Sequence, residues 1–299
     1  MVETLKKHTK QYLPPSLLRH LERYPYVFNP SIVYHLDSFL MTIRVYDTAS
    51  KSIQAHLYIW KKDAPYTFIN LTEFFAVTMA IQKVADPKLF LMNDEVWGTF
   101  NTGYVLKGRN QIVLFQMKDA KIHTFFTCDY SKRTSVEKNW AFFMEDACIY
   151  ALYGIDQEKV LKATSSDVIQ GGTLNFETYT TNKENNYKGY TIGTPLVALT
   201  NTSYGCIGHK KITFKGKRLY LGRAFTFSPF EETSLEINSP YLIHSLSSLR
   251  GASFKFNKNL ISCTYFSGMT IYNDELVISY GINDVAWNIV SIKKHKLWA

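Results

Sequence analysis

The residues that could carry chemistry stand at matching positions in five similar segments of this 299-residue chain. Eight residues before the turn of each segment stand Asn29, Asp86, Lys138, Thr194 and Phe266, and seven residues after it stand Arg44, Asn101, Tyr153, His209 and Gly281. Lys88 and Asn139 stand next to these positions, so the full set combines one carboxylate with several cations. Such a set suits transfer from a phosphorylated donor, because cations neutralise a departing phosphate while a carboxylate moves a proton.

Hydrolysis of a glycoside needs a second carboxylate, since the reaction uses two such groups roughly 5 to 9.5 Å apart. Asp284 is the next candidate, four residues after Tyr280, and Asp47 is a third. Glu137 alternates to the opposite face if its segment is extended. Four aromatic residues are expected either to stack on sugar rings or to pack in the core, namely Trp140, Tyr153, Phe266 and Tyr280.

The elements that must position these residues are five hairpins. Each segment has a polar start, an apolar strand, a polar turn and an aromatic-rich strand. The turn residues are Asp37, Asp94, Asp146, Thr202 and Asp274. Hairpins at intervals of 50 to 70 residues, with room for an outer hairpin between them, predict an all-β, five-bladed β-propeller. A β-sandwich also has many strands but does not predict a repeat of this period. The open ends of the five hairpins would ring one mouth of the central channel.

Two regions stand apart from the β pattern. Residues 1–25 are expected to form a helical N-terminal extension and residues 26–299 the propeller. The leucines of the extension either pack on the propeller or lie on a membrane surface, which leaves a weak peripheral contact as an alternative. A second helix is expected over 72–83. The chain contains no apolar run long enough to span a membrane.

The chain is basic, with 34 Lys and Arg against 25 Asp and Glu, and this favours anionic partners. The densest basic stretch surrounds a turn at 214–217 and contains Lys210, Lys211, Lys215, Lys217, Arg218 and Arg223. Lysines on a solvated edge strand explain the stretch as well as a binding patch does. No nucleic-acid motif accompanies it, so we expect no nucleic-acid partner.

Motifs for cofactors and metals are absent. There is no Gly-rich dinucleotide fingerprint, no P-loop, no Asp-x-Asp and no pair of cysteines at zinc spacing. We therefore expect no cofactor and no metal. With no secretory signal and four scattered cysteines, a cytoplasmic location is expected.

Five short motifs follow one another along the chain: Phe28-Asn-Pro-Ser-Ile, Ala85-Asp-Pro-Lys-Leu-Phe, Glu137-Lys-Asn-Trp, Ile192-Gly-Thr-Pro and Ile278-Ser-Tyr-Gly-Ile-Asn-Asp. Together they resemble the five-bladed propeller carbohydrate-active enzymes related to the β-mannoside phosphorylases, a group that includes mannosyltransferase/phosphorylases. The resemblance covers nearly the whole chain. It implies that Asp86 is the acid at the glycosidic oxygen, that Arg44, Lys138 and His209 hold phosphate, and that Asp284 matches the Asp that those enzymes have near the end of the fifth-blade strand.

The sequence departs from the pattern of that group in the second and fourth blades. Its Glu-Asp-Pro-Arg is here Ala85-Asp86-Pro87-Lys88, and its Gly-Gly-Thr-Pro is Ile192-Gly-Thr-Pro. Loss of the acidic neighbour changes the field on Asp86, and Lys88 lacks the bidentate fork of an arginine.

These observations lead to one main expectation and two alternatives. The main one is a glycosyltransferase of glycan or surface-polysaccharide assembly, which uses a phosphate-activated sugar, such as a sugar nucleotide, and a glycan as acceptor. The alternatives are a glycoside phosphorylase or hydrolase, and a propeller that binds carbohydrate without catalysis. Asp86 and Asp284 are expected to be catalytic. Substrate or phosphate contacts are expected from Asn29, Arg44, Lys88, Asn101, Lys138, Asn139, Thr194, His209 and Tyr280.

Overall fold

The structure, a computed structural model, is mostly β, as predicted. It describes residues 2–5, 11–62, 64–104, 108–165, 170–182, 187–231, 234–247 and 258–298. Most of its strands fall into five consecutive groups, here called units 1 to 5. Each unit contains one of the five predicted inner hairpins.

Units 1 and 2 are four-stranded antiparallel meanders. Unit 1 consists of β2 (Val27–His35), β3 (Ser38–Asp47), β4 (Ser52–Lys61) and β5 (Thr67–Asn70). Unit 2 consists of β6 (Ala85–Met92), β7 (Glu95–Asn101), β8 (Ile112–Lys118) and β9 (Lys121–Tyr130). The helix α2 (Leu71–Met79) connects them, where a helix was expected over 72–83. It starts at Asn70, whose side chain accepts the backbone N–H of Glu73 as an N-cap.

Unit 3 is again a four-stranded antiparallel meander, whereas among the described residues unit 4 has six strands and unit 5 has three. Unit 3 consists of β10 (Ala141–Glu145), β11 (Cys148–Gly154), β12 (Glu158–Ala163) and β13 (Thr173–Asn182). Unit 4 consists of β14 (Tyr190–Ile192), β15 (Val197–Ala198), β16 (Tyr204–Phe214), β17 (Lys217–Phe227), β18 (Leu235–Ile237) and β19 (Tyr241–Ile243). Unit 5 consists of β20 (Leu260–Tyr272), β21 (Glu275–Ile282) and β22 (Ala286–Lys293), followed by a 3-10 turn at Lys294–Lys296.

Tight turns explain why the inner hairpins form where the sequence predicted them. In four units the two turn residues both have positive φ: Leu36 and Asp37, Asn93 and Asp94, Asp146 and Ala147, Asn273 and Asp274. Successive left-handed residues are typical of the two-residue hairpin turn whose twist matches that of the strands, and Asn or Asp tolerates this conformation. The hairpin predicted at 214–217 is also present, with Lys215 and Gly216 at positive φ.

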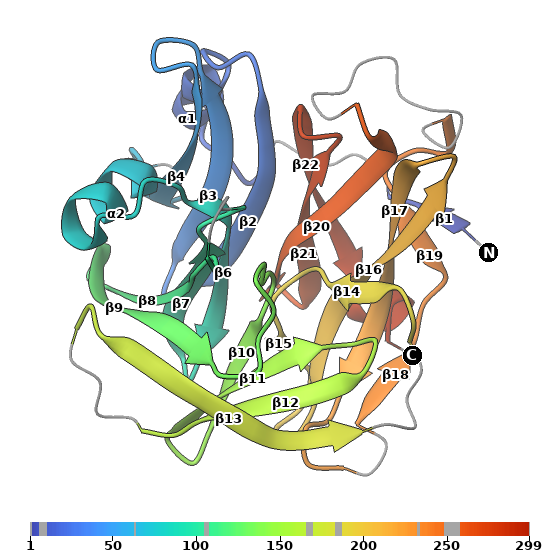
Figure 1. The fold of residues 1–299 in the computed structure, drawn as a ribbon. Helices are drawn as coiled ribbons and strands as arrows, with labels where there is room; N and C mark the ends of the chain where they lie inside the picture. Colours follow the sequence, from blue (N-terminus) through green and yellow to red (C-terminus); the bar gives the residue numbers. More distant parts are fainter. Residues whose placement is uncertain are drawn as a thin grey trace.

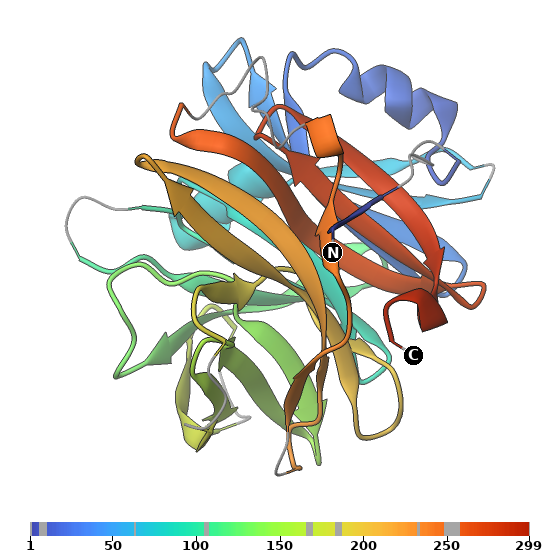
Figure 2. The ribbon, with the colours of Figure 1, turned by 90° about the vertical axis from the view of Figure 1, so that its right-hand side faces the viewer.

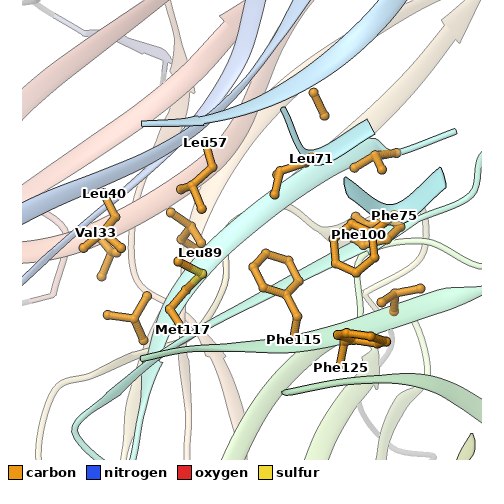
Figure 3. Packing of buried hydrophobic residues seen from close by; sticks show 14 of the residues in the cluster. Val33, Leu40, Leu57, Leu71, Phe75, Leu89, Phe100, Phe115, Met117 and Phe125 are labelled. Carbon is orange, nitrogen blue, oxygen red and sulfur yellow. The ribbon is translucent and has the colours of Figure 1, made fainter. Parts of the chain in front are cut away.

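The units are joined into a closed arrangement by five apolar clusters. Each cluster combines residues of two adjacent units, and the fifth joins unit 5 back to unit 1. In Figure 1 the chain colours pass once around the molecule, and the red strands of unit 5 return beside the blue strands of unit 1. Figure 3 shows the cluster between units 1 and 2, where Phe75 of α2 packs against Phe100, Phe115 and Phe125.

The N-terminal residues are only partly helical. The helix α1 spans Pro15–Leu21, and β1 (Val2–Thr4) pairs in parallel with β19 of unit 4 (Figure 2). Leu13, Leu17 and Leu21 are buried in the cluster between units 1 and 5. The packing alternative for the leucines is therefore the correct one, and this helix has no leucine face left for a membrane. Within the described residues, no helix is long and apolar enough to cross a membrane.

Candidate functional site

Backbone bulges place the first residues of the site. The β2–β3 register shifts between Phe28 and Ser31, and the β6–β7 register shifts at the matching point, so Asn29 and Asp86 lie in equivalent bulges. Both residues have positive φ, 52° and 49°, and both precede a proline. Asn and Asp adopt this left-handed conformation more readily than other side-chain-bearing residues, and bulges are known to redirect a side chain. The recurrence of Asn or Asp at this phase therefore reflects a repeated backbone feature.

Asp86 is held by an ion pair. Its Oδ1 lies 2.8 Å from Nη1 of Arg44 and accepts the side-chain N–H of Asn29 at 3.3 Å. The side chains of Arg44 and Asp86 are each only 12% exposed. Burial by itself would raise the pKa of Asp86, but the cations Arg44, Lys138 and Lys88 and the Asn29 bond reverse this, so the pKa is lower than usual. Asp86 is ionised at neutral pH.

Asp284 lies in the same field but has the opposite shift. Burial raises the pKa of its carboxyl, and the negative charge of Asp86 raises it further. Arg44, a side-chain hydrogen bond from Asn29 and Lys138 act in the other direction without cancelling the rise. Asn29 thus bonds to both carboxyl groups, one with a lowered pKa and one with a raised pKa. Environments that separate two carboxyl pKa values in this way are typical of acid–base pairs in active sites.

Lys88 joins units 2, 3 and 4. Its Nζ donates to Oδ1 of Asn139 at 2.8 Å and to the backbone carbonyl of Gly193, and it lies 5.7 Å from the ring centre of Tyr265. Lys88 is 2% exposed. Burial lowers the pKa of Lys88 to about 7, although Asp86 acts to raise it. Lys88 therefore ties three units together at the centre.

His209 is an acceptor and not a cation. It is buried, and its Nε2 accepts the backbone N–H of Phe266 at 2.8 Å. Burial and the charge of Lys88 lower the pKa of His209 to about 3. In this geometry His209 adds no positive charge, which differs from the expectation that it would help to hold phosphate, because a nitrogen that accepts a hydrogen bond carries no proton.

Asn139 occupies the position in unit 3 that the alignment on turns predicted for Lys138. The left-handed residue of unit 3 is Asn139, with φ 58°, one residue later than the alignment on turns predicted. Asn139 accepts bonds from Lys88 and from the hydroxyl of Tyr265, the latter at 3.1 Å. Lys138 is exposed and acts on Asp86 and Asp284 through its charge.

Three expected binding residues are engaged in the fold itself. Asn101 donates to the carbonyl of Ala85 at 3.1 Å and accepts the N–H of Gly103. The hydroxyl of Thr194 accepts the backbone N–H of Ile207 at 2.9 Å. Tyr280 is fully buried in the cluster between units 4 and 5. For these residues the structure differs from the expectation of substrate contact, because hydrogen bonds and core packing occupy them.

The aromatic candidates also pack inside the protein. Phe266 and Trp140 are buried in apolar clusters, so core packing is the correct alternative for them. The indole N–H of Trp140 and the hydroxyl of Tyr153 both donate to Glu137, at 3.0 and 2.6 Å. Glu137 is a buried carboxylate that anchors the segment before Lys138 and Asn139.

Tyr265 belongs to the site but was not among the residues predicted from the sequence. Its ring centre lies 4.7 Å from that of His209, and its hydroxyl bonds to Asn139. The usable signal was strand alternation, since Tyr265 precedes the core residue Phe266 and must face the other way. We call the resulting group the central cluster. It contains Asn29, Arg44, Asp86, Lys88, Asn139, His209, Tyr265 and Asp284.

Other parts of the molecule show different surroundings. A cavity of about 910 Å³ lies away from the central cluster, between the start of α1 and the ends of units 1 and 5. Among the described residues, no three of His, Cys, Asp or Glu gather as ligands for a metal ion. All four cysteines are free.

Comparison with solved structures gives full-length matches to carbohydrate-active enzymes. One is a structure of the GH130 family of mannoside phosphorylases, described as containing glycoside hydrolases that target β-1,2 mannosidic linkages in Candida mannan; its TM-score is 0.62 at 13% identity, over 99% of this chain and 92% of that one. Another is a predicted glycoside hydrolase of Parabacteroides distasonis, with TM-score 0.64 at 12% identity over 90% and 87%. A third is the β-1,2-mannobiose phosphorylase of Listeria innocua in complex with β-1,2-mannobiose, with TM-score 0.58 at 12% identity over 92% of both chains.

The resemblance seen in the sequence is thus present in three dimensions. The structural neighbours are five-bladed propeller enzymes, and at these identities the likeness is one of fold. No protein-family model and no curated protein sequence matches the chain.

Proposed function

We propose that the five units are the blades of a β-propeller and that the protein is a glycoside-cleaving enzyme, with the central cluster as its active site. The observation that carries this proposal is the carboxyl pair Asp86 and Asp284. Both bond to Asn29, and their pKa values are shifted in opposite directions. Cleavage of a glycosidic bond uses two carboxyl groups in different protonation states.

The pKa shifts assign the roles. Asp284 keeps its proton to a higher pH and donates it to the leaving oxygen as the glycosidic C–O bond breaks. Asp86 stays ionised beside Arg44 and faces the positive charge that develops on the sugar ring. This differs from the resemblance, which implies that Asp86 is the acid. The lowered pKa of Asp86 makes it a poor proton donor at neutral pH.

The substrate class follows from the comparisons and the charge. Two of the structural neighbours are described as acting on or binding β-1,2 mannosidic sugars, so we propose a β-mannoside as the substrate. Arg44 and Lys138 supply positive charge next to the carboxyl pair. This charge supports inorganic phosphate as an acceptor that competes with water, which would make the enzyme a phosphorylase.

The test is product analysis with β-1,2-mannobiose and longer β-mannosides, with and without inorganic phosphate. Free mannose as the only product identifies a hydrolase, and phosphate-dependent mannose 1-phosphate identifies a phosphorylase. Both activities should disappear in Asp284→Asn and Asp86→Asn and persist in Asp94→Asn, a change at an exposed turn. Absence of cleavage across β-mannosides, β-glucosides and β-galactosides would overturn the proposal.

Transfer from a sugar nucleotide, the main expectation from sequence, is the second candidate. It is supported by the same cations, which could neutralise a diphosphate leaving group. Release of a nucleoside diphosphate from a panel of sugar nucleotides, with no glycosidic cleavage, would favour it. We also propose a cytoplasmic location, which the four free cysteines support.

A further inference from the structure

The hairpin of β16 and β17 carries a concentration of positive charge with nothing negative beside it in the chain. Residues 187–230 contain seven Lys and Arg and no Asp or Glu. Around the turn, Lys211, Lys215 and Lys217 are all exposed. Neither of the two ion pairs formed among the described residues involves this hairpin. The field at its end is therefore positive and uncompensated by its own strands.

The same end exposes large apolar side chains. Phe214 is 62% exposed and Ile212 is 39% exposed. Phe214 pairs across the turn with Lys217, and strand alternation puts Phe214 and Ile212 on one face of the ribbon. Edge protection explains the lysines but not an exposed phenylalanine, because apolar residues at an edge favour aggregation. This tip differs from the exposed Leu36 at the β2–β3 turn because two exposed apolar side chains here lie close to three exposed lysines.

The hairpin extends beyond the site. Strand β14 accompanies β16 only as far as Lys210, and past that point β16 pairs with β17 alone. From His209 in the central cluster, β16 continues for five residues to Phe214, about 16 Å of strand. In Figures 1 and 2 this hairpin ends at the periphery of the fold.

We propose that the end of the β16–β17 hairpin is a docking site for an anionic lipid bilayer. Phe214 and Ile212 enter the boundary between headgroups and acyl chains, while Lys211, Lys215 and Lys217 contact the lipid phosphates. Apolar side chains flanked by lysines match both layers of such a surface, and each cation near it strengthens binding. Nucleic acid offers phosphates but no apolar layer for Ile212, so the lipid surface fits better. Docking through this hairpin places the side of the protein at which β16 ends next to the membrane.

The experiment is sedimentation of the full chain with vesicles of phosphatidylcholine alone or with about 30% phosphatidylglycerol. We expect binding to the anionic vesicles only, and its loss when salt rises from about 0.05 M to about 0.5 M. Lys215→Gln with Lys217→Gln should weaken binding about 25-fold, about fivefold per cation. Phe214→Ser should weaken it about tenfold or more, through loss of apolar burial.

Matched controls exist on other hairpins. Lys118→Gln with Lys121→Gln removes two cations at the β8–β9 turn, and Leu36→Ser removes a 78% exposed apolar side chain at the β2–β3 turn. Both should leave binding unchanged. Circular dichroism checks that each variant is folded. Failure to bind anionic vesicles at low salt, equal losses in the controls, or binding of an oligonucleotide in place of vesicles would each overturn the proposal.

Discussion

Arg44 and Asp86 form an ion pair between units 1 and 2, with Nη1 and Oδ1 2.8 Å apart. The Nε of Arg44 is buried and has no hydrogen-bond partner among the described residues, so Asp86 is the main compensation for the guanidinium charge. The pair therefore connects the stability of the ring with the ionisation of the site. Replacing one partner leaves an uncompensated charge in a largely buried position.

Asp86→Asn should cost both activity and stability. We expect activity to fall about 100-fold or more. The free energy of unfolding should fall by about 3 kcal/mol, because Arg44 loses its partner. Replacing an exposed surface carboxylate would cost only about 1 kcal/mol or less. Denaturant unfolding measures it, with Asp94→Asn as the exposed control. An unchanged midpoint would contradict the pairing seen here.

Asp284→Asn should lower activity without destabilising the protein. Its carboxyl pKa is raised by burial, so the amide removes a proton donor but no favourable charge. We expect a loss of about 100-fold on natural β-mannosides. The loss should be much smaller on dinitrophenyl glycosides, whose leaving group needs no proton. Equal losses on both substrates would exclude Asp284 as the acid. Asp86→Asn, by contrast, should have low activity on both substrates.

The pH dependence of kcat/KM should be bell-shaped. Activity needs Asp86 ionised and Asp284 protonated, so it falls as pH drops through the lowered pKa of Asp86 and as pH rises through the raised pKa of Asp284. Asp284→Asn should lack the alkaline limb, measured on a natural β-mannoside at high enzyme concentration, because a substrate whose leaving group needs no proton would hide this limb in the wild type as well. The contribution of Asp284 to the free energy of unfolding also decreases as pH rises. It is fully present below the ordinary pKa of an aspartate and is lost as pH rises through the raised pKa of Asp284. An alkaline limb that persists in Asp284→Asn belongs to another group.

His209 should stay neutral well below its ordinary pKa. The folded pKa is about 3, and since Nε2 accepts the Phe266 N–H, the ring proton is on Nδ1. Below about pH 6.5 the imidazole of His209 is protonated in the unfolded chain but stays neutral in the folded chain. The free energy of unfolding therefore falls as pH drops from about 6.5 toward 3. Nitrogen NMR at pH 5 should show the neutral Nδ1–H tautomer. A titration near 6.5 would disprove the buried hydrogen bond.

Gly281→Ala should disable the site through Asn29. A Cβ at residue 281 would lie 1.8 Å from Oδ1 of Asn29, so the Asn29 side chain must move away from Asp86 and Asp284. We expect a loss of activity of about 100-fold, with a shift of both limbs of the pH profile. Gly154→Ala is the matched control at the end of the β11 strand, where the nearest atom is 3.4 Å away. Full activity in Gly281→Ala would show that Asn29 does not position the carboxyl pair.

Local patterns in the sequence were enough to predict the secondary-structure elements and their repetition. Strand alternation and the Asn or Asp residues at the hairpin turns act over a few residues, so the five inner hairpins and the recurrence of Asn29 and Asp86 could be predicted without coordinates. The same information predicted the 214–217 turn and the burial of the N-terminal leucines as one alternative.

The tertiary structure alone decided which residues meet and in which protonation state. Asp86, Arg44 and Asp284 come from three units, and their proximity depends on closure of the ring by five apolar clusters. A one-residue difference in unit 3 brings Asn139 to the centre in place of Lys138, a shift that the spacing of turns does not encode. Burial then sets the opposite pKa shifts of the carboxyl pair and the neutrality of His209, because desolvation is a property of the packed molecule and not of the residue type.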